Sequence, residues 1–371
     1  MKTMHTNATG GQLGSAGRRT FLKGTGALVV AFHLPLAASR TAQAAGLSPS
    51  VPLNAVDSWL RIDGSGKVTL LSGKVELGTG IMTAYAQIVA EELDVPLKSV
   101  TVIQGDTAQT PDQGVTSASR SISVGGPQVR RAAAEARQAL LGMAAERFGV
   151  PASELTVSQG IVSHGASRVS YAKLIGDQRF ERTINEKVVL KKPADYKVVG
   201  TSARRVDIPG KVTADFTYIQ DVRVPGMLHA RVIRPAAIGA TLASAGTLPN
   251  RPKVRIVVKK DFLAVVAPTE WEAVQAAREL KPQWSGGGGL PTMRDFDAAL
   301  RAMPSHDVVI KSAGDLEAGL RQASRTLSAT YSWPFQSHGS IGPSCAVADV
   351  RGDGTATLWS STQDVYMQRE A

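Results

Sequence analysis

Two turns rich in glycine, serine and threonine are the segments of this sequence best suited to hold a ligand. The first, residues 73–80 (GKVELGTG), leads directly into residues 83–93, whose apolar spacing predicts a helix. Glycines let backbone N–H groups approach a ligand closely, and the N-terminus of a helix favours anions such as phosphate. Glycine-rich turns more often serve chain geometry alone, so this turn by itself leaves both interpretations open.

The second turn, residues 116–121 (TSASRS), stands ahead of another predicted helix. That helix is Ala-rich, opens at Pro127, runs to about Phe148 and stops at Gly149. Three hydroxyl-bearing serines and Arg120 can bind a pyrophosphate at this helix end. A purely geometric role is again the alternative.

Other motif matches fail on residue type or spacing. The sequence around Gly66-Lys67 lacks the hydroxyl residue and first glycine of a P-loop, and residues 351–353 lie in a turn between two predicted strands. Residues 338–342 lack the first glycine of a nucleophile elbow. No paired-histidine metal motif occurs, so no metal ligand is predicted. The single cysteine, Cys345, excludes a disulfide framework or Cys₄ cluster, and is expected to be a buried thiol in an apolar strand.

Composition excludes several classes of protein. The chain has 371 residues, 43% of them hydrophobic, which suggests two or three folded domains. Its net charge is +11, but aromatic residues make up only 5% and no basic run exceeds two residues. This pattern favours a solvated surface over a nucleic-acid-binding face.

The N-terminal segment predicts an export signal over residues 1–44. Arg18-Arg19 precedes Phe21-Leu22-Lys23, an apolar stretch over residues 24–38 and a small-residue site at 42–44. This layout resembles a twin-arginine (Tat) signal, which exports proteins already folded around a cofactor. We therefore expect a periplasmic protein that begins near Ala45. An uncleaved membrane anchor is the alternative, although the apolar stretch is short for a span.

The remaining sequence indicates α+β architecture. A hairpin turn is predicted at residues 63–66, and residues 93–102 repeat the pattern of residues 148–157, each reading as helix end, Val-Pro turn and strand. Further strands are predicted over residues 227–234, 254–259, 262–267, 329–333, 344–350 and 355–359. Further helices are predicted over residues 270–280, 295–303, 316–323 and 363–371, and the four glycines 286–289 read as a linker. The last helix has no stop signal, so a truncated chain is expected.

Taken together, the turns resemble a known family. Residues 73–136 closely resemble the molybdopterin-binding segment of the xanthine dehydrogenase/aldehyde oxidase family, in its isoquinoline 1-oxidoreductase and nicotinate dehydrogenase branch. Residues 198–242 look like its a/b hammerhead domain, and residues 331–366 look like the start of its main cofactor domain. The resemblance implies an α+β fold in which molybdenum-cofactor-binding pieces, residues 50–190 and 291–371, flank a hammerhead domain at residues 200–290.

The resemblance also implies an activity and partners. The cofactor would be molybdenum-molybdopterin in its cytosine dinucleotide form, with the metal held by the pterin rather than by protein side chains. The enzyme would hydroxylate an N-heterocycle or oxidise an aldehyde with oxygen from water. Electrons would pass to a small subunit that carries a 2Fe–2S cluster and, in exported members, to a cytochrome c.

Individual residues follow from the same resemblance. Gly78-Thr79-Gly80 matches the family's Gly-Gln-Gly cofactor turn with Thr in place of Gln, and Thr83 opens the helix behind it. Ser119-Arg120-Ser121 matches the dinucleotide turn. Gln336 matches the glutamine beside the apical oxygen of molybdenum. These residues are the expected cofactor-binding and catalytic positions.

Two features depart from the family pattern. Gly342 replaces a glutamate that usually follows the matched glutamine, and the family's catalytic glutamate would lie beyond Ala371. The chain alone is therefore expected to be inactive. A periplasmic aldehyde dehydrogenase of the same family is the first alternative. A non-catalytic binding module that kept the fold is the second.

Overall fold

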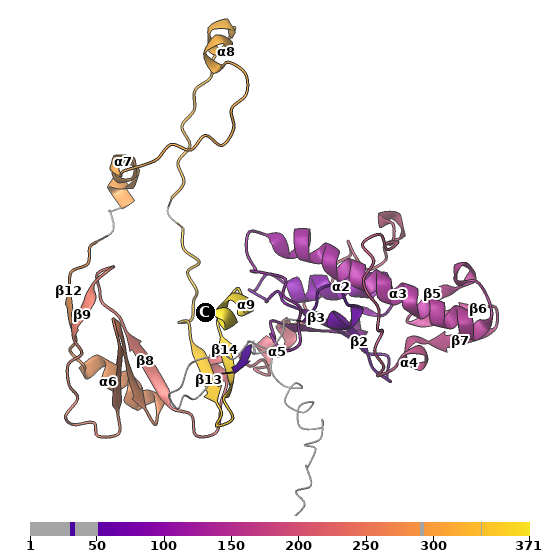
Figure 1. Cartoon of the computed structure of the whole chain (residues 1–371), viewed down its shortest axis with the longest axis horizontal. Coiled ribbons are helices and arrows are strands. Elements are labelled where there is room, and N and C mark those ends of the chain that lie inside the picture. Colours follow the sequence, from indigo (N-terminus) through magenta and orange to yellow (C-terminus); the bar gives the residue numbers. More distant parts are fainter. Residues whose placement is uncertain (1–29, 34–50, 290–292, 335) are drawn as a thin grey trace, which may run out of the picture. The chain divides into compact units, whose positions relative to one another are not determined.

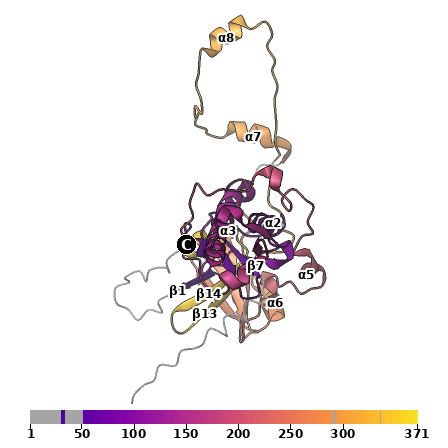
Figure 2. The same ribbon diagram turned by 90° about the vertical axis from the view of Figure 1, so that its right-hand side faces the viewer.

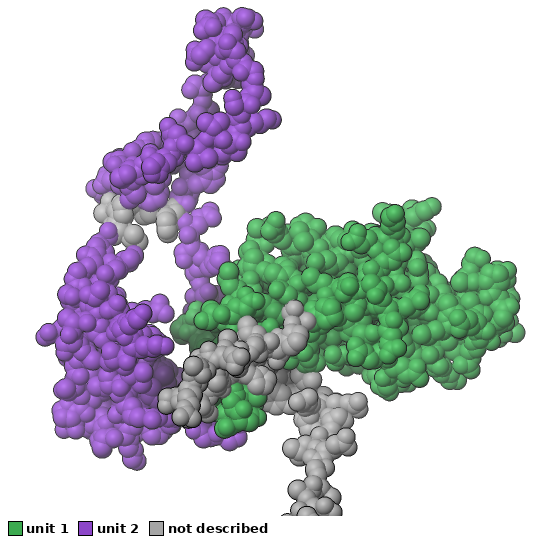
Figure 3. Space-filling view, in the orientation of Figure 1, with its two compact units in different colours: residues 1–222, 342–371 green, residues 223–341 purple. Residues whose placement is uncertain are grey.

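The computed structural model describes residues 30–33, 51–289, 293–334 and 336–371, which form two compact units (Figure 3). Unit 1 contains the chain up to Val222 together with residues 342–371, and unit 2 contains residues 223–341. The predicted signal lies outside the described residues, except for strand β1 (Val30–His33). No helix in the described ranges is long and apolar enough to span a membrane.

Unit 1 is built on a small mixed sheet. Its strands are β2 (Leu60–Ile62), β3 (Val68–Ser72) and β4 (Val100–Gln104), in the order β2-β3-β4. β2 and β3 are antiparallel, joined by the predicted hairpin turn, where the Asp63 carboxylate accepts backbone N–H bonds from Ser65 and Lys67. β3 and β4 are parallel because helix α2 (Ile81–Leu93) crosses between them.

Two helices pack on this sheet and on each other. α2 and α3 (Gly126–Phe148) lie side by side in both views (Figure 1, Figure 2). Trp59 and Tyr85 are fully buried between the layers, and the alanines of α3 let its backbone come close to its neighbours. Both predicted helices are confirmed to within two residues at each end.

The internal repeat is confirmed as a repeat of backbone geometry. α2 ends at Asp94 and α3 at Gly149, both in the left-handed conformation. Pro96 and Pro151 then each open a short 3₁₀ helix, η2 (Leu97–Ser99) and η4 (Ala152–Glu154). β4 follows the first copy. The second leads into the meander of β5 (Thr156–Ser158), β6 (Ile161–His164) and β7 (Ser167–Ser170), which ends at helix α4 (Tyr171–Leu174).

Residues 180–199, here called the strap, cross the two helices with little regular structure beyond η5 (Pro193–Asp195). Carboxylates hold the strap by its backbone. Glu91 of α2 accepts bonds from the N–H groups of residues 197–199 at 2.6–3.0 Å, and Glu135 of α3 accepts from Asn185. Both glutamates are almost fully buried, so their charges are satisfied by these bonds rather than by water.

The stability of unit 1 is expected to fall in acid because of Glu91. Burial acts to raise the pKa of its carboxyl, but the three strap N–H groups and Lys191 outweigh burial and hold the pKa below its ordinary value of 4.5. A depressed pKa stabilises the fold above the unfolded-state value, and this stabilisation is lost as the pH falls through the folded-state value. Glu91→Gln does not titrate. The difference in unfolding free energy between wild type and Glu91→Gln should therefore be constant near neutral pH and shrink below about pH 4.5. A difference independent of pH would contradict this role.

The end of the chain completes unit 1. β13 (Ala346–Val350) and β14 (Thr355–Ser360) form a hairpin, and β1 pairs with the free edge of β14. Helix α9 (Val365–Glu370) is capped by Asp364 and packs against Val75.

The expectation that Cys345 is a buried thiol within a strand is wrong. Cys345 precedes β13 and is only partly buried, so the thiol is not a core residue. Two short helices, α5 (Ile208–Val212) and η6 (Ile219–Asp221), lead out of the first part of unit 1.

Unit 2 contains an antiparallel sheet with the order β10-β11-β8, formed by β8 (His229–Ile233), β10 (Arg255–Lys259) and β11 (Phe262–Ala267). Helix α6 (Glu270–Glu279) buries Ala276 against Leu263 and Val265 of β11. Thr269 caps α6 by accepting the N–H of Glu272. These elements match the predicted ranges. The pair β9 (Thr241–Ser244) and β12 (Gln283–Ser285) was not anticipated.

The glycines 286–289, which were predicted as a linker, lie within unit 2: the divisions between the units fall at residues 222/223 and 341/342, and the Gly288 N–H bonds the carbonyl of Ile238. One expectation for unit 2 is wrong. Residues 329–333 form no strand: among the described residues no strand pairs with them, and Tyr331 and Trp333 are exposed. The predicted helices appear as α7 (Phe296–Ala302) and α8 (Leu316–Gln322). The domain limits and the hammerhead assignment stay predictions.

Candidate functional site

Both predicted turns leave the same edge of the unit 1 sheet. β3 and β4 are parallel and in register, with Ser72 opposite Gln104 at their carboxyl ends. Residues 73–80 run from the end of β3 to α2, and residues 105–125 run from the end of β4 to α3. Ligands of α/β sheets bind outside the carboxyl ends of parallel strands. The topology therefore brings together two turns that lie some 40 residues apart in sequence.

Side chains tie the two loops into one body. Gln113 Oε1 accepts hydrogen bonds from Ser72 Oγ at 2.6 Å and from the Gly73 N–H at 3.0 Å, and Thr116 Oγ1 accepts from the Val75 N–H at 3.0 Å. Gly73 also lies so close to the other loop that an added Cβ would stand 2.1 Å from the Pro111 carbonyl oxygen. A glycine is therefore required at this position for space.

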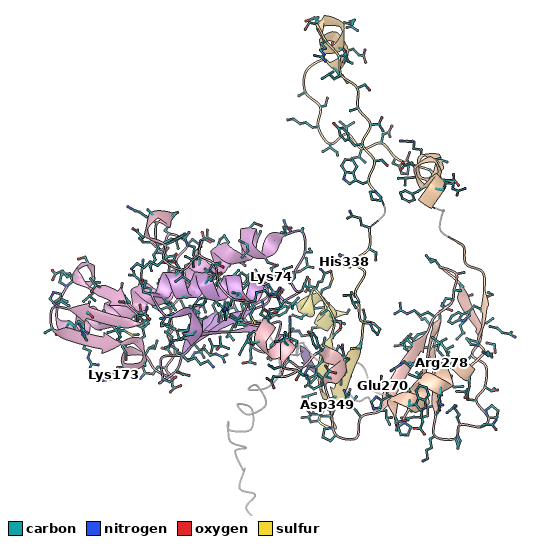
Figure 4. All side chains as sticks on the ribbon, turned by 180° about the vertical axis from the view of Figure 1, so that it is seen from behind. Lys74, Lys173, Glu270, Arg278, His338 and Asp349 are labelled. Carbon is teal, nitrogen blue, oxygen red and sulfur yellow. The ribbon has the colours of Figure 1, made fainter. Side chains whose placement is uncertain are left out.

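Lys74 is a buried cation between the loops (Figure 4). It is 3% exposed, and its Nζ donates to the carbonyl oxygens of Gly114 at 3.2 Å and Val115 at 2.7 Å. Burial lowers the pKa of Lys74, and nearby Arg120 lowers it further, whereas Asp364 and Asp112 act in the opposite direction. Lys74 therefore fixes the second loop and adds positive potential beneath it.

The Gly78-Thr79-Gly80 turn lies at the surface, just ahead of α2. Both glycines are left-handed, with φ of 89° and 84°, and Thr79 is exposed. The Glu76 carboxylate accepts from the N–H groups of Gly80 at 2.8 Å and Met82 at 3.1 Å. At this helix end the chain itself therefore supplies a carboxylate, and the binding of a cofactor at the turn stays a prediction. Thr83 is buried, and its hydroxyl accepts from the Val206 N–H.

The second turn reaches α3 through a π-helical turn, η3 (Ser121–Gly125), which the sequence analysis missed. Ser119 is left-handed with φ of 57°, and Ser119 and Arg120 are exposed. The carbonyl of Ser121 accepts a hydrogen bond from the Tyr85 hydroxyl at 2.7 Å, so this end of the turn is anchored to α2. The exposed hydroxyl and guanidinium donors are thereby left on the open side of the loop.

Gln336 lies in an exposed stretch of unit 2 without regular structure. The two cofactor turns belong to unit 1, and each unit is described by itself. The predicted position of Gln336 near the turns therefore stays a prediction. The described residues contain no group of three or more His, Cys, Asp or Glu side chains suited to a metal ion.

Comparison with known families gives the same assignment to both ends of the chain. Models of the molybdopterin cofactor-binding domain match residues 15–222 and residues 302–371. The chain belongs to the molybdopterin cofactor-binding family. The two turns predicted a relationship to the large subunits of xanthine dehydrogenase-type enzymes, and this prediction is confirmed.

Three curated relatives fit this family. A nicotinate dehydrogenase subunit of Pseudomonas putida is 39% identical over 95% of this chain and 30% of its own length. The beta subunit of isoquinoline 1-oxidoreductase from Brevundimonas diminuta is 28% identical over 93% of this chain and 51% of its own. Membrane-bound aldehyde dehydrogenase [pyrroloquinoline-quinone] of Gluconacetobacter polyoxogenes is 27% identical over 63% and 32%. The chain thus spans between about a third and half of the length of these relatives.

The donors at the sheet edge fit a molybdopterin group. Pterin and phosphate oxygens accept hydrogen bonds, and the exposed donors here are the Thr79 and Ser119 hydroxyls and the Arg120 guanidinium. The left-handed Gly78 has no other atom within 4 Å of an added Cβ, so the space beside its Cα is open to an approaching group. Thr79, Gly78 and Gly80 would hold the pterin, and the serines with Arg120 would hold a phosphate.

Sequence reasoning missed the residues that shape these turns. Glu76 had a local signal, since an acid within one turn of a helix start stabilises that end. Gln113 had none, because its partners lie about 40 residues away and meet it only across the parallel strands. Thr116 belongs to the predicted second turn, but nothing in the sequence shows its bond to the Val75 N–H. Lys74 belongs to the first turn, but nothing in the sequence shows that it is buried.

Proposed function

We propose that this chain is the molybdopterin-binding part of an oxidoreductase large subunit that hydroxylates an N-heterocycle of the nicotinate or isoquinoline type, with oxygen from water. The observation that carries the proposal is the joined pair of donor-rich turns at the carboxyl edge of β3 and β4. The 39% identity to a nicotinate dehydrogenase subunit across 95% of the chain favours this substrate class.

The cofactor would supply two-electron redox chemistry at the substrate carbon, and the chain's own residues would position it. The backbone of Gly78-Thr79-Gly80 receives the pterin. Arg120, with Ser119 and Ser121, receives the phosphates of the cytosine dinucleotide form, supported by the positive charge of Lys74 beneath the loop. Gln336 orients the substrate beside the metal. Electrons leave through a small subunit that carries a 2Fe–2S cluster and then through a cytochrome c. The folded protein reaches the periplasm by the Tat route.

Oxidation of an aldehyde is the second candidate, favoured by the relative from Gluconacetobacter polyoxogenes. The full-length gene product, purified with its partner subunits, tests both candidates. Metal and pterin analysis should find about one molybdenum and one pterin per large subunit, and turnover should be faster with a pyridine carboxylate than with aldehydes. Faster aldehyde turnover would favour the second candidate. A protein without molybdenum or pterin would contradict the proposal and indicate a binding module.

A further inference from the structure

The N-terminus of α2 is closed by a carboxylate of the same chain. Glu76 Oε1 accepts from the Gly80 N–H at 2.8 Å, and Oε2 accepts from the Met82 N–H at 3.1 Å. The side chain of Glu76 is only 11% exposed. Charge-assisted bonds of this kind are the interactions that a phosphate would otherwise make with a helix N-terminus. A second anion would have to displace Glu76 or approach against its charge.

Arg205 holds the other side of the same turn. Its Nη1 donates to the carbonyl oxygen of Gly78 at 2.7 Å, and its Nη2 lies 3.7 Å from Glu76 Oε1. The aliphatic stem of Arg205 also passes 3.5 Å from the position of a Cβ on Gly80. The turn and the start of α2 are therefore fixed at three places: the Gly78 carbonyl by Arg205, and the Gly80 and Met82 N–H groups by Glu76.

Arg205 is itself fixed by its own neighbourhood. Asp207 accepts from Arg205 Nε at 3.0 Å and Nη2 at 2.6 Å, and the hydrogen bond from Arg205, with that from Lys211, holds the pKa of Asp207 well below its usual range. The Val206 N–H donates to the Thr83 hydroxyl. Residues 205–207 are thus attached to the start of α2. The four charges of Glu76, Arg205, Asp207 and Lys211 cancel.

We propose that Glu76 and Arg205 are positioning residues for the cofactor turn: the Glu76 carboxylate takes the place of a ligand anion at the start of α2 and, with Arg205, sets the backbone of Gly78-Thr79-Gly80 before the cofactor arrives. This inference rests on the proposed function for the cofactor itself. Because the network is neutral overall, the turn recognises the pterin through Thr79 and the backbone groups that Glu76 and Arg205 leave free, and charged phosphates are bound elsewhere.

The first test measures amide hydrogen exchange of the cofactor-free 371-residue chain. In Glu76→Gln and Arg205→Ala, the amides of residues 78–82 should exchange about tenfold faster or more than in wild type, because charged hydrogen bonds are lost. Glu146→Gln and Arg204→Ala serve as matched controls, since both side chains are exposed and lie outside this network. The amides of α3 report on global stability and should not change. Unchanged exchange at residues 78–82 would overturn the proposal.

The second test uses inorganic pyrophosphate as a probe for a vacant helix end. Wild-type chain should show no pyrophosphate-dependent protection at residues 80–83, because Glu76 fills that position. Glu76→Ala should gain protection there, since its helix N-terminus is then free for an anion. A merely structural glutamate would give loss of order without such a gain. Protection at residues 80–83 in wild type, or its absence in a folded Glu76→Ala, would contradict the proposal.

The third test uses the full-length enzyme with its partner subunits. Pterin occupancy should fall about tenfold in Glu76→Ala, be partly restored in Glu76→Gln and stay unchanged in Glu146→Gln. Equal occupancy in all variants would refute a role in positioning the turn for the cofactor. Absence of pterin from wild type would instead refute the proposed function, and the exchange and pyrophosphate results would still decide whether Glu76 closes the helix end.

Discussion

Gly73→Ala should lower the free energy of unfolding of unit 1 by about 3 kcal/mol, at the upper end of what overpacking typically costs. The new Cβ would stand 2.1 Å from the carbonyl oxygen of Pro111 and 2.9 Å from the nitrogen of Gln113. Both atoms belong to the backbone and cannot rotate away. The two loops must separate, which would also break the hydrogen bonds that Gln113 makes with Ser72 and Gly73.

Gly142→Ala is the matched control for this substitution. Gly142 lies inside α3, and nothing stands within 4 Å of an added Cβ. Because glycine disfavours a helix interior, this change should stabilise the chain by about 0.5–1 kcal/mol. Urea unfolding measures the free energy of unfolding of both variants, which should fall in Gly73→Ala and rise in Gly142→Ala. A Gly73→Ala chain as stable as wild type would show that the loops are not in close contact.

Gln336→Ala in the full-length enzyme should lower kcat by about 10²–10³ while molybdenum and pterin contents stay at the wild-type level. The amide is proposed to contact the reacting centre, and a donor that acts mainly in the transition state affects kcat more than KM. The pterin, not this glutamine, would hold the metal.

Thr79→Ala provides the opposite pattern in the same assay. Thr79 is exposed in the cofactor turn, so its loss should reduce pterin occupancy and leave turnover per molybdenum nearly intact. Metal analysis combined with steady-state kinetics separates the two outcomes. Equal loss of occupancy in both variants would make Gln336 a structural residue, and full activity of Gln336→Ala would remove it from the site.

Local signals in the sequence were sufficient for the helices and for the repeated unit after them. Pro127 and Gly149 bracket α3, and the left-handed positions after both helices follow from the Asp-Val-Pro and Gly-Val-Pro sequences. Residues 329–333 show the limit of such signals. A strand-like composition does not make a strand without a partner, and partners depend on contacts that composition does not encode.

In the candidate site, too, the residue types are visible in the sequence but the long-range contacts are not. The glycines and serines of both turns were recognisable because their residue types are local properties. Their meeting at one sheet edge depends on the parallel pairing of β3 with β4. The role of Glu76 depends on Arg205, which lies 127 residues from Gly78 along the chain. Long-range pairs of this kind are invisible to spacing arguments within one segment.

We propose that the cofactor binds at the carboxyl edge of β3 and β4. Amide hydrogen exchange of the full-length protein, compared with and without bound molybdopterin, measures where it binds. Binding should slow exchange in residues 76–82 and 117–125, whereas the β5–β7 meander at residues 156–170 should be unaffected and serves as the internal reference. Protection confined to other segments, with both turns exchanging at the cofactor-free rate, would contradict the account.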